Sequence, residues 1–467
     1  MERNGRTTEN RNALRMAPFL VMALTISAPS MLQSLISTLV STADTVMLGY
    51  VSQDAMSASS LANQLPHVMS MAFFGLMAGS SVLSSQYWGK KDTDTIEKVL
   101  GLAIRLTLLI SLLFFALAFF LPEYVMRYFT DDEAVIALGV RYLKIVSFSY
   151  LFNGFSNIYV SVVRSTERVV LPIAVYLISL AVNVTLNAVF IFGLFGAPVL
   201  GLTGVAIGTL AARVAEVIVC LVYDAAVSPI KIRLRALLTT GKVLTKDFFK
   251  VSLPSVANDV LWSLATTVYS VVIGHMGSDA VAANAVAVMA VNIGAVVCRG
   301  FNGGATIIIS KPLGAGDRET AKLYSKRMLA IAVIVGVLGC LTIIGIRPLI
   351  AGMYADKLTE NALSLLNMMF VMRAIQLIGE SINTCTICGC FRAGGDAKFG
   401  MVTDLVFMWL VTVPLVLLAA YGLKLPLKWV YLTICLDEFY KMPVPTIHYF
   451  RFGWLNDITR SRSELEA

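Results

Sequence analysis

PSMLQSLISTLVSTADTVMLG, residues 29–49, is the stretch that decides the fold class of this chain. It lies inside an apolar run that begins near Met16 and is long enough to cross a bilayer at about 1.5 Å per residue. The run nevertheless contains one carboxylate, Asp44. Because an ionised group at membrane depth costs at least about 2.5 to 3.5 kcal/mol, we expect Asp44 to face a water-filled cavity or to bind a cation. The alternative is that Asp44 lies near the outer membrane interface.

The composition of the whole chain places it in a membrane. Of its 467 residues, 57% are hydrophobic and only 14% are charged, and the mean hydropathy is +0.77. A single soluble core could not hide that much apolar surface. The apolar run after the polar first fifteen residues exceeds the hydrophobic part of a signal peptide and lacks a cleavage site, so we expect the first helix to be retained.

Apolar segments of about twenty residues or more predict about twelve membrane-spanning helices and an all-α integral membrane protein. The approximate ranges of the predicted spans are 16–46, 56–86, 97–121, 134–163, 170–193, 201–225, 248–274, 280–310, 320–346, 360–391, 398–421 and 427–449. Lys and Arg lie almost entirely in the loops on one side of these spans, which predicts that both termini are cytoplasmic. The formal net charge of +8 follows from this topology and from anionic lipid, and requires no nucleic-acid partner.

An internal repeat divides the chain into two halves of six predicted spans each. Residues 29–49 align without a gap on PSVANDVLWSLATTVYSVVIG, residues 254–274. The residues that stay in register include prolines, glycines and aspartates, namely Pro29 with Pro254, Gly49 with Gly274, Asp54 with Asp279, Gly75 with Gly300, Gly79 with Gly304, and Asp92 with Asp317. Because six is an even number, both halves enter the membrane in the same direction and form a parallel repeat about an axis along the membrane normal.

The repeat predicts four parts of the chain. These are an amino-terminal six-helix bundle at 1–225, a cytoplasmic linker at 226–247, a carboxy-terminal six-helix bundle at 248–450, and a cytoplasmic tail at 451–467. The basic linker region is compatible with a short amphipathic helix on the membrane surface. Two like bundles around a cleft are typical of transport by alternating access, and the prolines inside the first helix of each half are predicted bend points.

The turns and the polar residues of the chain offer little enzyme chemistry. Asp92 and Asp317 follow glycine-containing turns and are predicted to cap the next helix. The seven cysteines lie mostly in apolar runs, and CxxCxC at 385–390 has no second cluster beside it, so packing is the preferred interpretation. We find no nucleophile, base or metal constellation, and predict neither an enzyme nor a cofactor.

Several segments, taken in order, resemble the multidrug and toxic compound extrusion (MATE) transporters. They are P(x)14DTVMLG at 29–49, QYWGKKD at 86–92, NVTLNAVFIFG at 183–193 followed by GLTGVAIGT at 201–209, and FRAGGDAKFG at 391–400. The resemblance covers nearly the whole chain, including the number of spans and the duplication. It implies a monomeric plasma-membrane antiporter that exports small organic compounds, cationic and amphipathic, in exchange for inward H⁺ or Na⁺.

The resemblance also assigns a cation-coupling site in the first half. Asp44 matches the first-helix carboxylate that binds H⁺ or Na⁺, and Na⁺ there is the only metal ion expected. The polar residues matching the rest of this site are Asn153 or Asn157 of the fourth span, Asn183 and Asn187 of the fifth, and Thr209 of the sixth. The spacing of Asn183 and Asn187 puts both on one helix face. Some family members carry a second carboxylate where this chain has Asn187, so Asp44 is expected to be the main titrating group.

A second site in the other half is a further hypothesis. Asp259 lies in the seventh span, where other branches of the family place the coupling carboxylate, and Arg373 with Glu380 forms either part of that site or a structural ion pair. The remaining ionisable residues within predicted spans include Arg299, Asp404, and the pair Arg213 and Glu216, which we expect to neutralise each other.

A flippase for a lipid-linked precursor is the alternative function, because its architecture is related. Such a protein should place several Arg or Lys side chains inside the cleft to hold a pyrophosphate. Few basic residues of this chain lie deep within the predicted spans.

Overall fold

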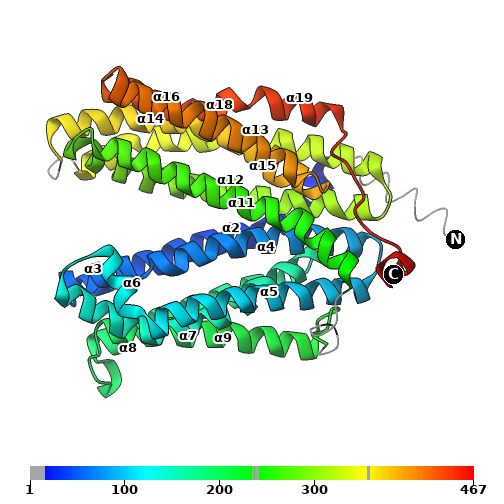
Figure 1. The fold of residues 1–467 in the computed structure, drawn as a ribbon, viewed down its shortest axis with the longest axis horizontal. Coiled ribbons are helices and arrows are strands. Elements are labelled where there is room, and N and C mark those ends of the chain that lie inside the picture. The colour runs from blue at the N-terminus through cyan, green and yellow to red at the C-terminus, as the bar shows by residue number, and fades with distance from the viewer. Residues whose placement is uncertain (1–15, 234–235, 237–240, 355–357, 467) are drawn as a thin grey trace. The chain divides into compact units, whose positions relative to one another are not determined.

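The computed structural model describes residues 16–233, 236, 241–354 and 358–466, without the side chains of residues 41, 42, 45, 46, 293, 294, 299, 302, 465 and 466. Every regular element in these ranges is a helix (Figure 1). Among the described residues, ten helices are long and apolar enough to cross a membrane, and α12 (Ser278–Gly314) gives an eleventh span when its two parts are joined. The predicted fold class, an all-α integral membrane protein, is confirmed.

The helices of the first half lie close to the predicted spans. They are α2 (Met16–Gly49), α3 (Gln53–Ala62), α4 (Gln64–Gly89), α5 (Thr93–Phe120), α6 (Pro122–Phe129), α7 (Glu133–Ser165), α8 (Val170–Phe192) and α9 (Leu202–Ala226). The second predicted span corresponds to α3 and α4 together, and α6 is a short additional helix that begins at a proline. Exposed leucines on α5, such as Leu109 and Leu113, form the apolar surface that a lipid-facing helix requires.

The helices of the second half follow the same order until the last two spans. They are α11 (Lys242–Gly274), α12, α13 (Arg318–Tyr354), α14 (Glu360–Thr384), the π-helix η2 (Cys385–Phe391), α15 (Ala397–Leu405), the π-helix η3 (Val406–Thr412), α16 (Val413–Leu417), the π-helix η4 (Leu418–Gly422), α17 (Leu427–Cys435), α18 (Asp437–Lys441), α19 (Pro443–Arg451) and α20 (Arg462–Glu466). The span predicted at 427–449 is therefore divided among three short helices. Pro443 and Pro445 cannot donate backbone hydrogen bonds, which is one reason for the interruption.

The repeat is visible in the turns that precede α5 and α13. Asp92 accepts hydrogen bonds from the backbone N–H of Thr95 at 3.1 Å and from its hydroxyl at 2.7 Å, and Asp317 accepts the same pair from Thr320 at 3.0 and 2.7 Å. The prediction that both aspartates are helix caps is confirmed. The left-handed backbone of each turn falls on Lys91 (φ 62°) and on its repeat partner Gly316 (φ 80°), not on the glycine that ends the preceding helix.

The described chain forms two compact units. Among the described residues, one contains 16–31 and Leu253–Thr459, and the other contains Leu32–Ser252 and 460–466. The boundaries fall inside α2 and α11, close to Pro29 and Pro254, although both helices continue through their prolines. These bounds differ from the bundles drawn from the repeat, because α2 and α11 each contribute residues to both units. Residues 234–235 and 237–240 of the predicted linker at 226–247 lie outside the description, and α11 begins within that linker, at Lys242.

One pair of equivalent contacts explains why these two helices are shared. A Cβ atom added to Gly304 of α12 would lie 2.0 Å from Ser27 Oγ of α2, and one added to Gly79 of α4 would lie 1.8 Å from Ser252 Oγ of α11. Ser27 and Ser252 are repeat partners, as Gly79 and Gly304 are. Each unit therefore makes this close helix contact once, and only glycine leaves room for it.

Candidate cation-coupling site

A cavity of about 1110 Å³ lies within the unit that contains Leu32–Ser252. Side chains of α2, α3, α4, α7, α8 and α9 line it. The lining includes five of the predicted site residues, which are Asp44, Asn153, Asn157, Asn183 and Thr209. The structure thus brings together side chains from four predicted spans that are far apart in the sequence, and places Asp44 at a cavity as its position in an apolar run suggested.

A chain of hydrogen bonds connects Asp44 to the fifth and sixth spans. Asn187 Nδ2 donates to Asp44 Oδ1 at 2.5 Å and to Asn183 Oδ1 at 3.3 Å. Asn183 Nδ2 donates in turn to Thr209 Oγ1 at 3.4 Å. Asn187 is fully buried, and its Oδ1 has no hydrogen-bond partner. The described partner of Asp44 is therefore a neutral amide, and among the described side chains no cation lies within ion-pair distance of it.

Small residues on α9 hold this arrangement in place. A Cβ atom on Gly208 would lie 2.2 Å from Asn187 Oδ1, and one on Gly204 would lie 2.4 Å from Phe190 Cβ. The glycines of the GLTGVAIGT run therefore let α9 approach α8 closely enough to place Thr209 beside Asn183. Helix packing and site geometry share one cause here.

The two asparagines of the fourth predicted span both face the cavity. Asn157 Nδ2 donates to the backbone oxygen of Asn153 at 2.9 Å and to its Oδ1 at 2.6 Å. Because they are four residues apart on α7, both occupy the same helix face. Neither bonds to Asp44 among the described contacts, so they extend the polar lining instead of completing the shell around the carboxylate.

A second carboxylate in the cavity is already neutralised. Glu216 exposes 2% of its surface and accepts hydrogen bonds from Ser156 Oγ at 2.8 Å, Ser179 Oγ at 2.6 Å and Arg213 Nη1 at 2.6 Å. The expectation that Arg213 and Glu216 neutralise each other is confirmed by this ion pair. Asp44 has no cationic partner among the described side chains, and the third carboxylate of the lining, Asp132, accepts hydrogen bonds from backbone N–H groups at the start of α7.

The family model described as MatE matches residues 29–189 and again residues 254–418. The chain belongs to the MatE family. The two matches begin at Pro29 and Pro254, the positions that align the two halves, which agrees with the internal duplication. The resemblance to MATE transporters is confirmed, and members of this family are membrane transporters, not enzymes.

Individual relatives cover most of this MatE protein. The "Uncharacterized transporter YisQ" of Bacillus subtilis is 25% identical over 85% of the chain and 86% of its own length. The rabbit protein "Multidrug and toxin extrusion protein 1" (Oryctolagus cuniculus) is 22% identical over 88% of the chain and 72% of its own length.

Solved structures share the fold. One titled "Crystal structure of MATE in the bent conformation" has a TM-score of 0.84 at 17% identity and covers 93% of this chain and 95% of its own. Another, an "Outward-facing conformation of a multidrug resistance MATE family transporter of the MOP superfamily", has a TM-score of 0.83 at 18% identity and covers 93% and 96%.

The predicted residues of the second half of this MatE protein have different described partners. Asp259 Oδ1 pairs with Arg392 Nη2 at 2.8 Å. Arg373 donates to the hydroxyl of Tyr431 at 3.1 Å and to Gln376 Oε1 at 2.9 Å, and Glu380 is one of its electrostatic neighbours. The side chain of Arg299 lies outside the description.

Sequence reasoning missed a group of buried charged side chains in that half. Asp437, Glu438 and Lys441 lie on α18, inside a span that was predicted as a uniform helix, and Lys441 also pairs with Asp404 of α15. The signal that could have revealed them is the run DEFYK at 437–441, whose Glu and Lys are three residues apart within an apolar segment.

Proposed function

We propose that this protein is a secondary active multidrug efflux antiporter of the plasma membrane, which exports organic, cationic and amphipathic compounds in exchange for inward H⁺ or Na⁺. The observation that carries the proposal is Asp44, a carboxylate in a polar cavity with an amide, not a cation, as its described partner. The free energy of a carboxylate in such a position is lower when it binds a cation or a proton than when it stays ionised without a partner.

Exchange of one positive partner for another at Asp44 is the proposed mechanism. The ionised carboxylate attracts a cationic substrate and keeps water in the cavity. When H⁺ or Na⁺ arrives from outside, the carboxylate is neutralised and both attractions weaken. A turn of the Asn187 amide would replace the Nδ2 donor at Asp44 by the free Oδ1, which can accept the proton of neutral Asp44 or bind Na⁺. Substrate then leaves and the transporter reorients by alternating access.

The available driving force is sufficient for export. One charge moving through about 100 mV supplies about 2.3 kcal/mol. One pH unit supplies about 1.4 kcal/mol, since this energy corresponds to a tenfold ratio of proton activity. Together these gradients support a substrate ratio of more than about a hundredfold.

The lining of the cavity supports an amphipathic cationic substrate. Apolar side chains of α3 and α4, including Met56, Phe73, Phe74 and Met77, line the same cavity as the polar residues around Asp44. Its volume suits a drug-sized molecule, and thioether and aromatic groups adapt to different shapes. The names of relatives, such as "Probable multidrug resistance protein NorM", agree with this substrate class.

The flippase alternative is less well supported. Arg213 is the one Lys or Arg among the described residues that line the cavity, and its guanidinium already pairs with Glu216. A pyrophosphate would therefore meet the carboxylates of the cavity with no free Lys or Arg of the described lining to hold it.

The remaining parts of the proposal are the topology and the assembly state. The excess of Lys and Arg in the loops of one side supports cytoplasmic termini. A complete cavity within one unit of a single chain supports a monomer that works in the lipid bilayer without a cofactor or a nucleic-acid partner.

Uptake of a fluorescent organic cation into everted membrane vesicles tests the function. Gradients of H⁺ and Na⁺ are imposed separately on wild type, Asp44→Asn and the control Asp54→Asn, which changes an exposed carboxylate of the same half. We expect wild type and Asp54→Asn to respond to one of the gradients and Asp44→Asn to respond to neither. Full-rate uptake by Asp44→Asn would remove Asp44 from the coupling site.

A further inference from the structure

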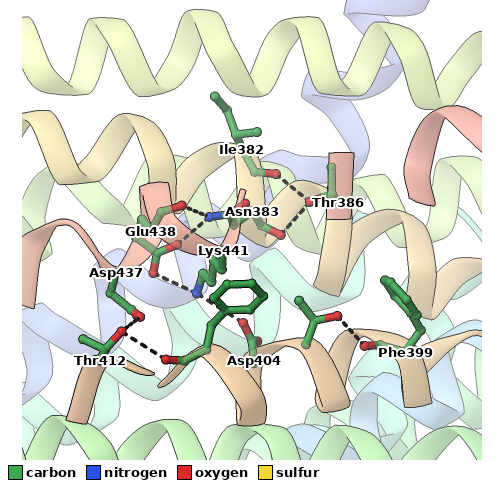
Figure 2. A network of polar contacts seen from close by, with 11 residues as sticks. Ile382, Asn383, Thr386, Phe399, Asp404, Thr412, Asp437, Glu438 and Lys441 are labelled. Carbon is green, nitrogen blue, oxygen red and sulfur yellow. Dashed lines mark hydrogen bonds and ion pairs between the residues drawn. The ribbon is translucent and has the colours of Figure 1, made fainter. Parts of the chain in front are cut away.

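Four buried charged side chains gather in the unit that contains Leu253–Thr459, which is not the unit that contains the cavity of Asp44. We name Asp404, Asp437, Glu438 and Lys441 the Lys441 cluster (Figure 2). Lys441 Nζ lies 3.2 Å from Asp404 Oδ1 and 3.1 Å from Glu438 Oε1. The exposed fractions of the four residues are 8%, 3%, 5% and 4%, so water does not screen these charges.

Neutral side chains complete the surroundings of the carboxylates. The hydroxyl of Thr412 donates to Asp437 Oδ1. Asn383 Nδ2 donates to Glu438 Oε2 at 2.9 Å and to the backbone oxygen of Glu438 at 2.6 Å, as Figure 2 shows. The Oδ1 atom of the same amide is buried and has no hydrogen-bond partner, although Asn383 exposes only 2% of its surface. The Oδ1 atom of Asn383 is therefore an acceptor without a donor. It belongs to the same amide that donates to Glu438.

The charges of the Lys441 cluster do not balance, because three carboxylates share one ammonium. The nearest charged groups on other elements are the pair Arg392 and Asp259, together with Arg373 and Glu380 on α14. Adding them gives three cations against five carboxylates. The side chain of Arg299 is outside the description, and counting it as a fourth cation still leaves a carboxylate in excess. The other titratable groups facing the cluster are neutral in their ordinary state, namely Tyr269, Tyr440 and Cys388.

An excess of buried negative charge is relieved at lowest cost by a proton. A metal ion is a poor alternative because the Lys441 ammonium already occupies the space between Asp404 and Glu438. Among the described residues, no group of three or more His, Cys, Asp or Glu could hold a metal ion. A proton on a carboxyl oxygen adds a hydrogen-bond donor, which the free acceptor of Asn383 lacks. It also removes one negative charge, of which the cluster has an excess.

The first half of the chain has a balanced counterpart. Glu216, on the sixth span of its half, is held by Ser156 and Ser179 of the fourth and fifth spans and by Arg213 three residues away. Glu438 likewise lies on the sixth span of its half, with an amide from the fourth span and a lysine three residues away. The second half differs in having two more carboxylates without a second cation among the described members of the cluster.

The backbone around the Lys441 cluster departs from regular α-helix on all three contributing spans. Asn383 comes two residues before the π-helix η2, Asp404 comes just before the π-helix η3, and Thr412 ends η3. The segment α18 is five residues long, and after Met442 the next helix begins at Pro443. Such irregular segments are uncommon and occur often at functional positions.

We infer that the Lys441 cluster is a proton-binding site of the second half of the chain, separate from Asp44. The proton comes from water, forms an O–H bond with a carboxylate oxygen of Asp437 or Glu438, and returns to water when that bond breaks. Binding of this proton does not depend on the proposed function, whereas its use in ion-coupled export rests on it.

Infrared spectroscopy of the full-length protein in lipid bilayers tests this inference without a transport assay. A protonated carboxyl has a stretching band separate from that of a carboxylate. At neutral pH we expect this band in wild type and in Asp44→Asn, and its loss when the double variant Asp437→Asn with Glu438→Gln is made in the Asp44→Asn background. The control Asp247→Asn removes a buried carboxylate whose described ion pair is with Arg460, and should leave the band unchanged.

Two further variants keep the test decisive if the double variant does not fold. Lys441→Met removes the cation and should increase the band, since the carboxylates then need an additional proton. Asn383→Leu removes the free acceptor and should shift the frequency of the band. Transfer to D₂O should shift it as well, because the proton exchanges with water. The inference is overturned if the band is absent, if neither the double variant nor these two variants change it, or if it does not respond to D₂O. Failure of Asp44→Asn in the vesicle assay leaves these outcomes unaffected.

Discussion

Replacement of Gly79 by alanine tests the close contact between a glycine and a serine of neighbouring helices, which each unit makes once. The added Cβ would lie 1.8 Å from Ser252 Oγ, 2.9 Å from Ser252 Cβ and 3.2 Å from its Cα. The first two distances are far below van der Waals contact, so α4 and α11 must separate or the serine must leave its position. Overpacking of this kind costs about 1 to 3 kcal/mol.

The helix propensity of alanine acts in the opposite direction. Alanine is favoured over glycine inside a helix by roughly 1 kcal/mol. We therefore expect Gly79→Ala to be destabilising by up to about 2 kcal/mol in the wild-type background. In a Ser252→Gly background the two clashing atoms are absent, and the same substitution should be neutral or stabilising by up to about 1 kcal/mol.

Thermal unfolding of the purified protein in detergent measures this change of sign. The control Gly345→Ala adds a Cβ within α13, where no atom lies within 4 Å, and should give only the propensity gain. The repeat predicts the same result for Gly304→Ala with Ser27→Gly. The reasoning is refuted if Gly79→Ala has the same effect on stability in both backgrounds, because the contact would then not be the cause.

Three more predictions concern single positions. Lys91→Gly should stabilise the protein by about 0.5 to 1 kcal/mol in thermal unfolding, because Lys91 holds a left-handed backbone (φ 62°) that glycine adopts freely; an unchanged or lower midpoint would contradict this. Gly208→Ala, whose Cβ would lie 2.2 Å from Asn187 Oδ1, should reduce ion-driven uptake at least tenfold while most of the protein stays folded, and wild-type uptake would show that Asn187 does not position Asp44. Hydrogen bonds from Ser461 lower the pKa of the exposed carboxyl of Glu464, so this contact is present at neutral pH and is lost as the pH falls through that lowered pKa; an NMR titration that gives an ordinary or raised pKa for Glu464 would disprove it.

Hydropathy alone predicted most of the fold. Apolar segments longer than a bilayer crossing have few alternative structures, which is why each predicted span from 16–46 to 398–421 coincides approximately with a helix or a run of adjoining helices. The last span was different. Its breaks depend on two prolines and on charges that find partners on other spans, and a window average over 427–449 does not detect either feature.

The sharing of α2 and α11 between units could not be predicted from the repeat. The duplication suggests that every helix stays with its own half. Which unit a helix segment joins depends instead on contacts such as Ser27 with Gly304, which only the folded chain reveals. The glycines in register were visible in the sequence, but their partners were not.

The polar residues around Asp44 and the Lys441 cluster also differ in how far the sequence could predict them. Asn183, Asn187 and Thr209 lie in segments that resemble a known family, so they could be named from the sequence. The structure connects them to Asp44 through hydrogen bonds. The Lys441 cluster belongs to no such motif, and its charges pair across α15 and α18, so spacing along the chain gave little indication of it.

Exchange of an ion at Asp44 for exported substrate is the central claim, and coupled flux in proteoliposomes measures it most directly. Purified wild type and Asp44→Asn are reconstituted, a gradient of an organic cation is imposed, and the movement of substrate and of H⁺ or Na⁺ is recorded together. We predict that in wild type the cation moves down its gradient while H⁺ or Na⁺ moves the opposite way, and that Asp44→Asn shows no ion movement. Substrate transport by wild type without any opposite ion flux would contradict the account.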